Sequence, residues 1–116
     1  MLNTIIIMGR LTRDPELKHT EAGDSVVSFT VAVGRDYGKD QTDFIDCVAW
    51  KAAAEYISKY FSKGCKVVVT GRLQIRDWTD KDNNKRRSAE VIVGSIYHAD
   101  SRPEQKEVSS GEELPF

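Results

Sequence analysis

Apolar and polar residues alternate along most of the first hundred positions, which is the period of a β-strand with one buried face. The alternating segments are rich in Val, Ile, Thr and aromatic residues, as strands are. A break at Asp14-Pro15 and a turn signal at 22–24 bound a polar segment over 16–24 that predicts no strand. We therefore predict five strands, which cover residues 3–13, 25–36, 42–50, 66–77 and 88–97.

One segment, residues 51–63, has the period of a helix instead. Gly64 follows it, and glycine is common just after a helix end. We predict an amphipathic helix whose packing stripe consists of Ala53, Tyr56, Ile57, Tyr60 and Phe61.

The predicted order is three strands, one helix and two strands around a charged loop at 80–87. This is the order of an OB-fold, an all-β, five-stranded Greek-key barrel with one helix between strands 3 and 4. Gly9 supplies a bend or bulge in the first strand. A small barrel without a nucleic-acid role fits the same topology, because fold does not fix function. The predicted core consists of Val27, Phe29, Val31, Val33, Ile45, Cys47, Ala49, Val67, Val69, Leu73 and Ile75.

The net charge of −1 conceals two regions of opposite sign. Residues 1–99 hold 15 Lys and Arg against 13 Asp and Glu, whereas residues 100–116 hold 2 against 5. The second region lacks periodicity and is polar, which is typical of a disordered tail. We predict a folded domain over 1–99 and a flexible acidic tail over 100–116.

Composition excludes several classes of protein. No run approaches the ~20 apolar residues of a membrane-spanning helix, and residues 1–8 do not form a secretory signal, so we expect a cytoplasmic protein. Cys47 and Cys65 lie in apolar strand contexts and are expected to be buried thiols, not zinc ligands with His19 and His98. No catalytic motif is present, so we expect neither enzyme activity nor a metal or cofactor.

The ten aromatic residues divide by context. Phe29 and the three helix aromatics are expected in the core, and Tyr97 is ambiguous. Phe116 lies in the tail, and the other four fall on loops or on the non-core faces of strands, where exposed rings can stack on nucleobases. These candidate stacking residues are Tyr37, Phe44, Trp50 and Trp78.

Arginines and lysines accompany these aromatics. Arg72 and Arg76 share a strand face with Trp78, and guanidinium groups both pair with phosphate and stack on bases. A solvated surface is the simpler explanation for any single lysine. The candidate phosphate contacts are Arg10, Arg13, Lys18, Arg35, Lys51, Arg72, Arg76, Lys85, Arg86 and Arg87.

The sequence resembles bacterial single-stranded DNA-binding proteins over residues 1–98 and again at its last five residues. The resemblance is carried by the Asn3–Leu11 pattern, Asp14-Pro-Glu, 29–32, Thr42-Asp-Phe, Val48-Ala-Trp50, Ala54-Glu55, Tyr60-x-x-Lys63-Gly64, Gly71-Arg-Leu73 and Trp78-Thr. It implies a homotetramer of OB-folds that coats single-stranded DNA in replication, recombination and repair, near the nucleoid.

The family's base-stacking positions match the four candidate aromatics. Its partner-binding tip matches Glu112, Glu113, Leu114, Pro115 and Phe116. The linker before this tip is only about a dozen residues, and Asp46 places a carboxylate between two stacking positions. Two other readings fit the same residues: an interaction module that mainly organises an assembly through the tip, and an OB-fold for structured RNA.

Overall fold

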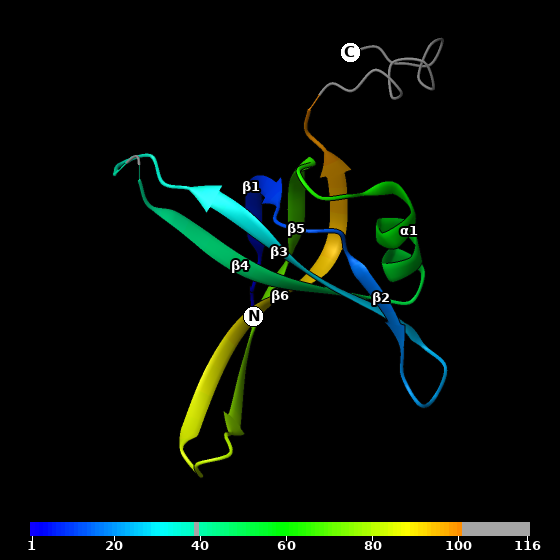
Figure 1. Ribbon diagram of the computed structural model, residues 1–116, viewed down its shortest axis with the longest axis vertical. Coiled ribbons are helices and arrows are strands. Elements are labelled where there is room, and N and C mark those ends of the chain that lie inside the picture. The colour runs from blue at the N-terminus through cyan, green and yellow to red at the C-terminus, as the bar shows by residue number, and fades with distance from the viewer. Residues whose placement is uncertain (39, 101–116) are drawn as a thin grey trace.

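The computed structural model describes residues 1–38 and 40–100. It contains six strands and one helix in these residues. Figure 1 shows a barrel from which two hairpins project, one formed by β3 and β4 and the other by β5 and β6. The elements are β1 (Ile5–Leu11), β2 (Glu16–His19), β3 (Ser25–Gly34), β4 (Thr42–Trp50), α1 (Ala52–Tyr60), β5 (Lys66–Thr79) and β6 (Lys85–His98).

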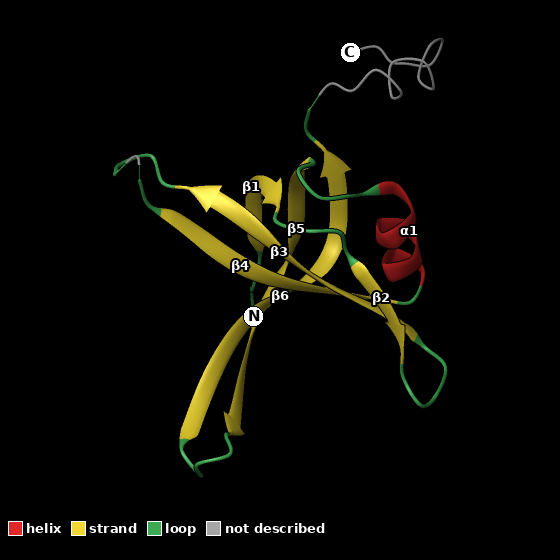
Figure 2. Cartoon of the chain, in the orientation of Figure 1, coloured by secondary structure: helices red, strands yellow, loops and turns green. Residues whose placement is uncertain are grey.

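The strands close into a barrel in the order β1, β5, β6, β4, β3 and back to β1. Closure comes from a short antiparallel pairing of β1 with β3, Arg10 with Ala32 and Leu11 with Val31. The pairing of β4 with β6 is parallel, and the other pairings are antiparallel. This order, with α1 between β4 and β5, is that of an OB-fold, so the predicted fold class is confirmed (Figure 2).

Two local predictions were wrong. The polar segment after Pro15 contains β2, whose four residues are all exposed and pair with the first half of β3. This strand forms because its backbone hydrogen-bonds to the edge of β3. Its sequence has no hydrophobic alternation, so the pattern could not predict it. The helix ends at Tyr60, because Phe61 has extended backbone, and Gly64 lies in the following turn with a φ of 89° instead of ending the helix.

The core lies between the inner faces of the strands and one side of α1. It consists of Leu11, Val27, Phe29, Val31, Cys47, Ala49, Ala54, Ile57, Phe61, Cys65, Val67, Val69, Val91 and Ile96. Val33 and Ile45 pack against it while partly buried. Leu73 and Ile75, expected in the core, are 38% and 51% exposed. They lie on the same side of β5 as the buried Val67 and Val69, but they follow Gly71, where the pairing of β5 with β1 ends.

Two glycines permit close backbone contacts. A Cβ at Gly9 would collide with the carbonyl oxygen of Ala32, where β1 meets β3, and one at Gly71 would collide with that of Ile92. The ladder of β5 and β6 is irregular between Thr70 and Gly71. At Gly9, where the sequence predicted a bend or bulge, the structure therefore has a close approach of β1 to β3. The irregular pairing lies instead in the hairpin of β5 and β6.

Both cysteines are buried thiols outside any disulfide, as predicted. Burial, with a smaller contribution from the charge of Asp46, raises the pKa of the Cys47 thiol to about 12. Such a thiol stays protonated and unreactive at neutral pH. Over residues 1–38 and 40–100, no cluster of three metal-ligating side chains occurs, and no helix is long and apolar enough to span a membrane.

Candidate nucleic-acid interface

The outer face of β4 carries two exposed aromatic rings. Alternation along this strand directs Cys47 and Ala49 into the core and turns Phe44 and Trp50 outward, where they are 67% and 45% exposed. Phe44 lies opposite Ala32 on β3, and this small neighbour leaves the ring uncovered. Both rings can therefore present a face to a flat ligand.

The hairpin of β5 and β6 carries the third ring on a cationic face. Arg72, Arg76 and Trp78 alternate along β5, and Trp78 is 44% exposed. The indole N–H donates a hydrogen bond of 2.7 Å to the hydroxyl of Ser88 on β6. From Arg72 to Trp78 the strand advances by about 20 Å, so these groups are spread along an arm.

The platform on β4 and the cationic arm form one surface. Ile92 on β6 pairs with Val48 on β4 and with Arg72 on β5. Paired residues of neighbouring strands point to the same side of a sheet. The outer face therefore continues from the rings of β4, across Ile92, to the arginines of the arm.

Tyr37 lies apart from this surface, in the loop between β3 and β4, and is 89% exposed. Arg35 fastens that loop. Its guanidinium donates hydrogen bonds to the Asp43 carboxylate, the shortest 2.8 Å, and one of 2.6 Å to the side-chain oxygen of Gln41. The hydrogen bond to Asp43 raises the pKa of Arg35, and the same hydrogen bond lowers the pKa of Asp43.

The tip of the arm is organised by Asp80. Its carboxylate accepts hydrogen bonds from the backbone N–H groups of Asp82 and Asn84 and from Nε of Arg86, at 3.0, 2.9 and 2.8 Å. The hydrogen bond from Arg86 is the main reason that the pKa of Asp80 is lowered. A groove of about 710 Å³ lies beside this turn, lined by Asp77, Trp78, Thr79, Lys85, Arg86 and Arg87.

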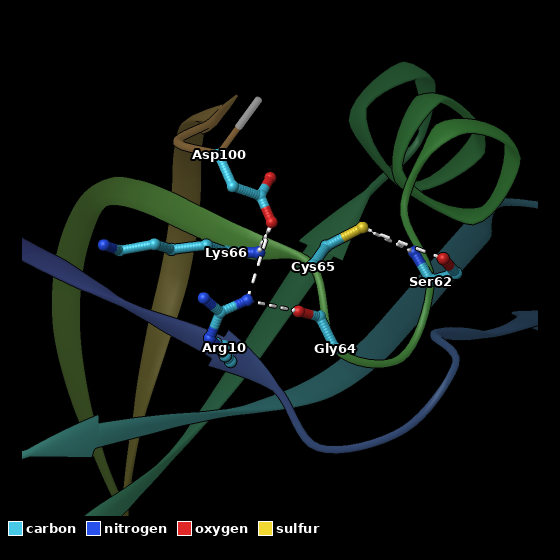
Figure 3. A network of polar contacts seen from close by, with 6 residues as sticks. All are labelled: Arg10, Ser62, Gly64, Cys65, Lys66 and Asp100. Carbon is cyan, nitrogen blue, oxygen red and sulfur yellow. Dashed lines mark hydrogen bonds and ion pairs between the residues drawn. The ribbon is translucent and has the colours of Figure 1, made fainter. Parts of the chain in front are cut away.

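The ten candidate phosphate contacts divide into two groups. Five have partners within the chain: Arg10 with Gly64 and Asp100 (Figure 3), Lys18 with Glu16, Arg35 with Asp43, Arg86 with Asp80, and Arg87 with Asp77. In the part of the chain that the structure describes, the side chains of the other five form no ion pair or hydrogen bond. These are Arg13, Lys51, Arg72, Arg76 and Lys85.

A second groove of about 710 Å³ has the opposite electrostatic character. Its lining includes the carboxylates of Asp14, Glu16, Asp46 and Glu90, with Arg13 as its one cation among the described residues. Asp46 Oδ1 accepts a 3.0 Å hydrogen bond from Thr30. Since carboxylates repel phosphate, a nucleic-acid backbone is expected to follow the arm's arginines and avoid this groove.

Two helix aromatics expected in the core lie at the surface. Tyr56 and Tyr60 are 46% and 51% exposed, whereas Phe61 is buried and stacks on His98 with ring centroids 4.0 Å apart. The predicted packing stripe was therefore wrong at these two positions, since the residues of α1 that are fully buried are Ala54 and Ile57.

Two features of the surface escaped the sequence analysis. Ser88 could not be recognised as the partner of Trp78, because no pattern marks a lone serine in a strand. The outer faces of β1 and β6 expose Ile6, Met8 and Tyr97, at 66%, 53% and 58%. Residues 5–8 are apolar without alternation, and this signal could have indicated a strand covered on both sides.

The closed barrel, its helix and the outward rings define the chain as an OB-fold protein of the oligonucleotide-binding architecture. The chain belongs to the single-strand binding protein family, whose model matches residues 2–99. It is 36% identical over 114 residues to single-stranded DNA-binding protein 1 of Lactococcus lactis, covering 95% of this chain and 76% of the relative.

Two further relatives carry similar names. Single-stranded DNA-binding protein 1 of Staphylococcus aureus is 46% identical over 100 residues, which cover 83% of this chain and 64% of the relative. The single-stranded DNA-binding protein of Halalkalibacterium halodurans is 38% identical over 114 residues, covering 95% and 68%. The chain thus spans about two thirds to three quarters of the length of these relatives.

Lys51 gives a prediction about backbone strain next to Trp50. Its φ of 59° and ψ of −126° form a conformation that favours glycine. Replacing Lys51 by Gly is expected to raise the free energy of unfolding by about 1 kcal/mol, because the strain released exceeds the entropy that glycine loses. Urea unfolding at fixed protein concentration measures this change.

Lys59→Gly is the matched control, since Lys59 lies in the last turn of α1 with ordinary helical backbone. It should lower the free energy of unfolding by about 1 kcal/mol. Equal losses in the two variants would show that Lys51 is unstrained.

Proposed function

We propose that this protein coats single-stranded DNA without sequence preference, as a binding protein and not as a catalyst. The observation that supports this most is the continuous outer face joining Phe44 and Trp50 to Arg72, Arg76 and Trp78. Exposed rings stack on any base, and unpaired guanidinium groups bind phosphates, which together give sequence-tolerant binding. The relatives' names agree with this proposal.

The division of the cations refines the proposed path. Within the described chain, the side chains of Arg72, Arg76 and Lys85 along the arm form no ion pair or hydrogen bond, nor does that of Lys51 beside Trp50. Arg10, Lys18, Arg35, Arg86 and Arg87 would have to break or share an existing contact to bind phosphate. We therefore assign the main phosphate contacts to the first group and mainly structural work to the second.

Trp78→Ala is expected to weaken binding of oligo-dT by at least about 1 kcal/mol, because one stacked base loses its partner. Arg76→Met should reduce the slope of log K against log salt by about 0.7, the effect of one phosphate contact on a single strand. Titration of a labelled oligo-dT by anisotropy, at several salt concentrations, measures both changes.

Lys59→Met is the control for the loss of a surface cation and should leave affinity and slope unchanged. Unlabelled oligo-dT should compete efficiently, and duplex or hairpin RNA should not. Absence of tryptophan quenching by oligo-dT at low salt would remove the basis for this function, and efficient competition by structured RNA would favour the RNA alternative.

We also propose that the protein is a homotetramer. Two different surfaces support this. Among the described residues, positions 5–8 of β1 pair with β5 alone, which leaves their other edge open to a second copy. Met8, Val68 and Tyr97 lie side by side on the outer face of β1, β5 and β6, and form an apolar surface. Two distinct self-complementary contacts generate a tetramer with dihedral symmetry.

Met8→Glu is expected to break the contact through the apolar surface, since it would bury an unpaired charge. Light scattering should then show a fall from near four times the 13.1 kDa chain mass to a smaller species. Leu17→Glu, on the exposed face of β2, is the control and should remain tetrameric. A wild-type monomer, or an unchanged mass for Met8→Glu, would contradict the assignment.

The proposed domain division gives the last residues a separate role. The tip, Glu112 to Phe116, lies outside the described residues, and its acidic and apolar composition supports a role in binding replication, recombination and repair proteins in the cytoplasm. Deletion of residues 112–116 should abolish capture of such proteins by the immobilised chain while leaving oligo-dT affinity unchanged. Loss of DNA binding on deletion would show that the tip and the barrel do not act separately.

A further inference from the structure

The indole of Trp78 is held by a hydrogen bond that the sequence did not predict. Trp78 pairs with Arg86 across the hairpin, whereas Ser88 pairs with Arg76. The 2.7 Å hydrogen bond from the indole N–H to Ser88 Oγ is therefore diagonal. The bond inclines the ring along the arm toward the barrel, in the direction of the Arg76–Ser88 pair.

The neighbouring arginines on β6 are engaged elsewhere and do not hold the indole of Trp78. Arg86 is bound to Asp80 and Arg87 to Asp77, each with Nε 2.8 to 2.9 Å from a carboxylate oxygen. No other side chain hydrogen-bonds the indole within residues 1–38 and 40–100. The arm beyond the barrel has no core to immobilise an exposed ring, so this bond is its main directional restraint.

A restrained ring binds better than a free one. Fixing a mobile side chain on binding costs conformational entropy, and a ring already held in place loses less. The bond also occupies the only polar group of the indole, so that the ring offers a nucleic acid its π-face and no hydrogen-bond donor. Both effects favour sequence-neutral stacking.

We propose that Ser88 is a positioning residue for the stacking of Trp78 on single-stranded DNA. This inference rests on the proposed function, because it assumes that Trp78 stacks on bases. Ser88 itself touches no base in this scheme. It acts through the indole N–H alone, so its effect depends on the presence of that group.

The test is a double-mutant cycle with labelled oligo-dT and full-length protein. Ser88→Ala should weaken binding about threefold to tenfold, which is the range for one hydrogen bond. Ser88→Thr keeps the hydroxyl and should stay within about twofold of wild type. Ser95→Ala, on the same strand and without a side-chain hydrogen bond in the described chain, should have no effect.

Trp78→Phe keeps an aromatic ring and removes the N–H. In that background Ser88→Ala should cause no further loss. With ¹⁵N-labelled tryptophan, the two indole N–H resonances of Trp50 and Trp78 report the bond directly, and Ser88→Ala should shift only the one that Trp78→Phe removes.

An undiminished loss in the Trp78→Phe background would overturn the proposal, since Ser88 would then act by another route. So would unchanged affinity of Ser88→Ala when Trp78→Ala binds weakly, and in that case the proposed function stands. If Trp78→Ala binds oligo-dT as tightly as wild type, the stacking role of Trp78 fails and the inference fails with it.

Discussion

The architecture depends on two places where backbone meets backbone too closely for a side chain. At Gly9 the strand β1 passes against the carbonyl of Ala32, and this contact accompanies the pairing that closes the barrel. At Gly71 the strand β5 passes against the carbonyl of Ile92, where the ladder with β6 is irregular and the hairpin turns out of the barrel. The first contact allows the barrel to close around its core, and the second allows the hairpin of β5 and β6 to project from the barrel as an arm.

The alternation of apolar and polar residues predicted the side of each strand on which a residue lies. Whether that side is buried depends on where the strand lies within the closed barrel. This is why Val67 and Val69 are buried, whereas Leu73 and Ile75, on the same side of β5, are exposed. The four candidate aromatics lie outside the core as predicted. Phe44, Trp50 and Trp78 were identified from the direction of their side chains on strands, and Tyr37 from its place at a loop. Strand β2 depends on its pairing with β3 across a hairpin, and the bond to Ser88 depends on the register of the hairpin of β5 and β6. The alternation within a single segment encodes neither.

The charges matter through their partners more than through their number. Residues 1–99 carry only a small positive excess, and half of the candidate cations are already bound to carboxylates or carbonyl groups. Exposed ion pairs stabilise a fold little, but those of Arg35 and Arg86 connect the two sides of their hairpin loops. Among the described residues, Arg72 and Arg76 on the arm have no carboxylate partner, whereas Arg13 lines the acidic groove. Phosphate is therefore expected at the arm and not at the groove.

The outer row of β5 connects the two proposed surfaces. Before Gly71 this row holds Val68 beside Met8 and Tyr97, and after it the row holds Arg72, Arg76 and Trp78. An apolar row can bury itself only against a neutral surface, whereas a row of arginines and an aromatic ring suits a charged, flat ligand. Because one strand carries both rows, association through the first would fix the direction in which the second extends. The geometry of the assembly would then set where each arm presents its ring, and a substitution near Gly71 would alter subunit contact and DNA path together.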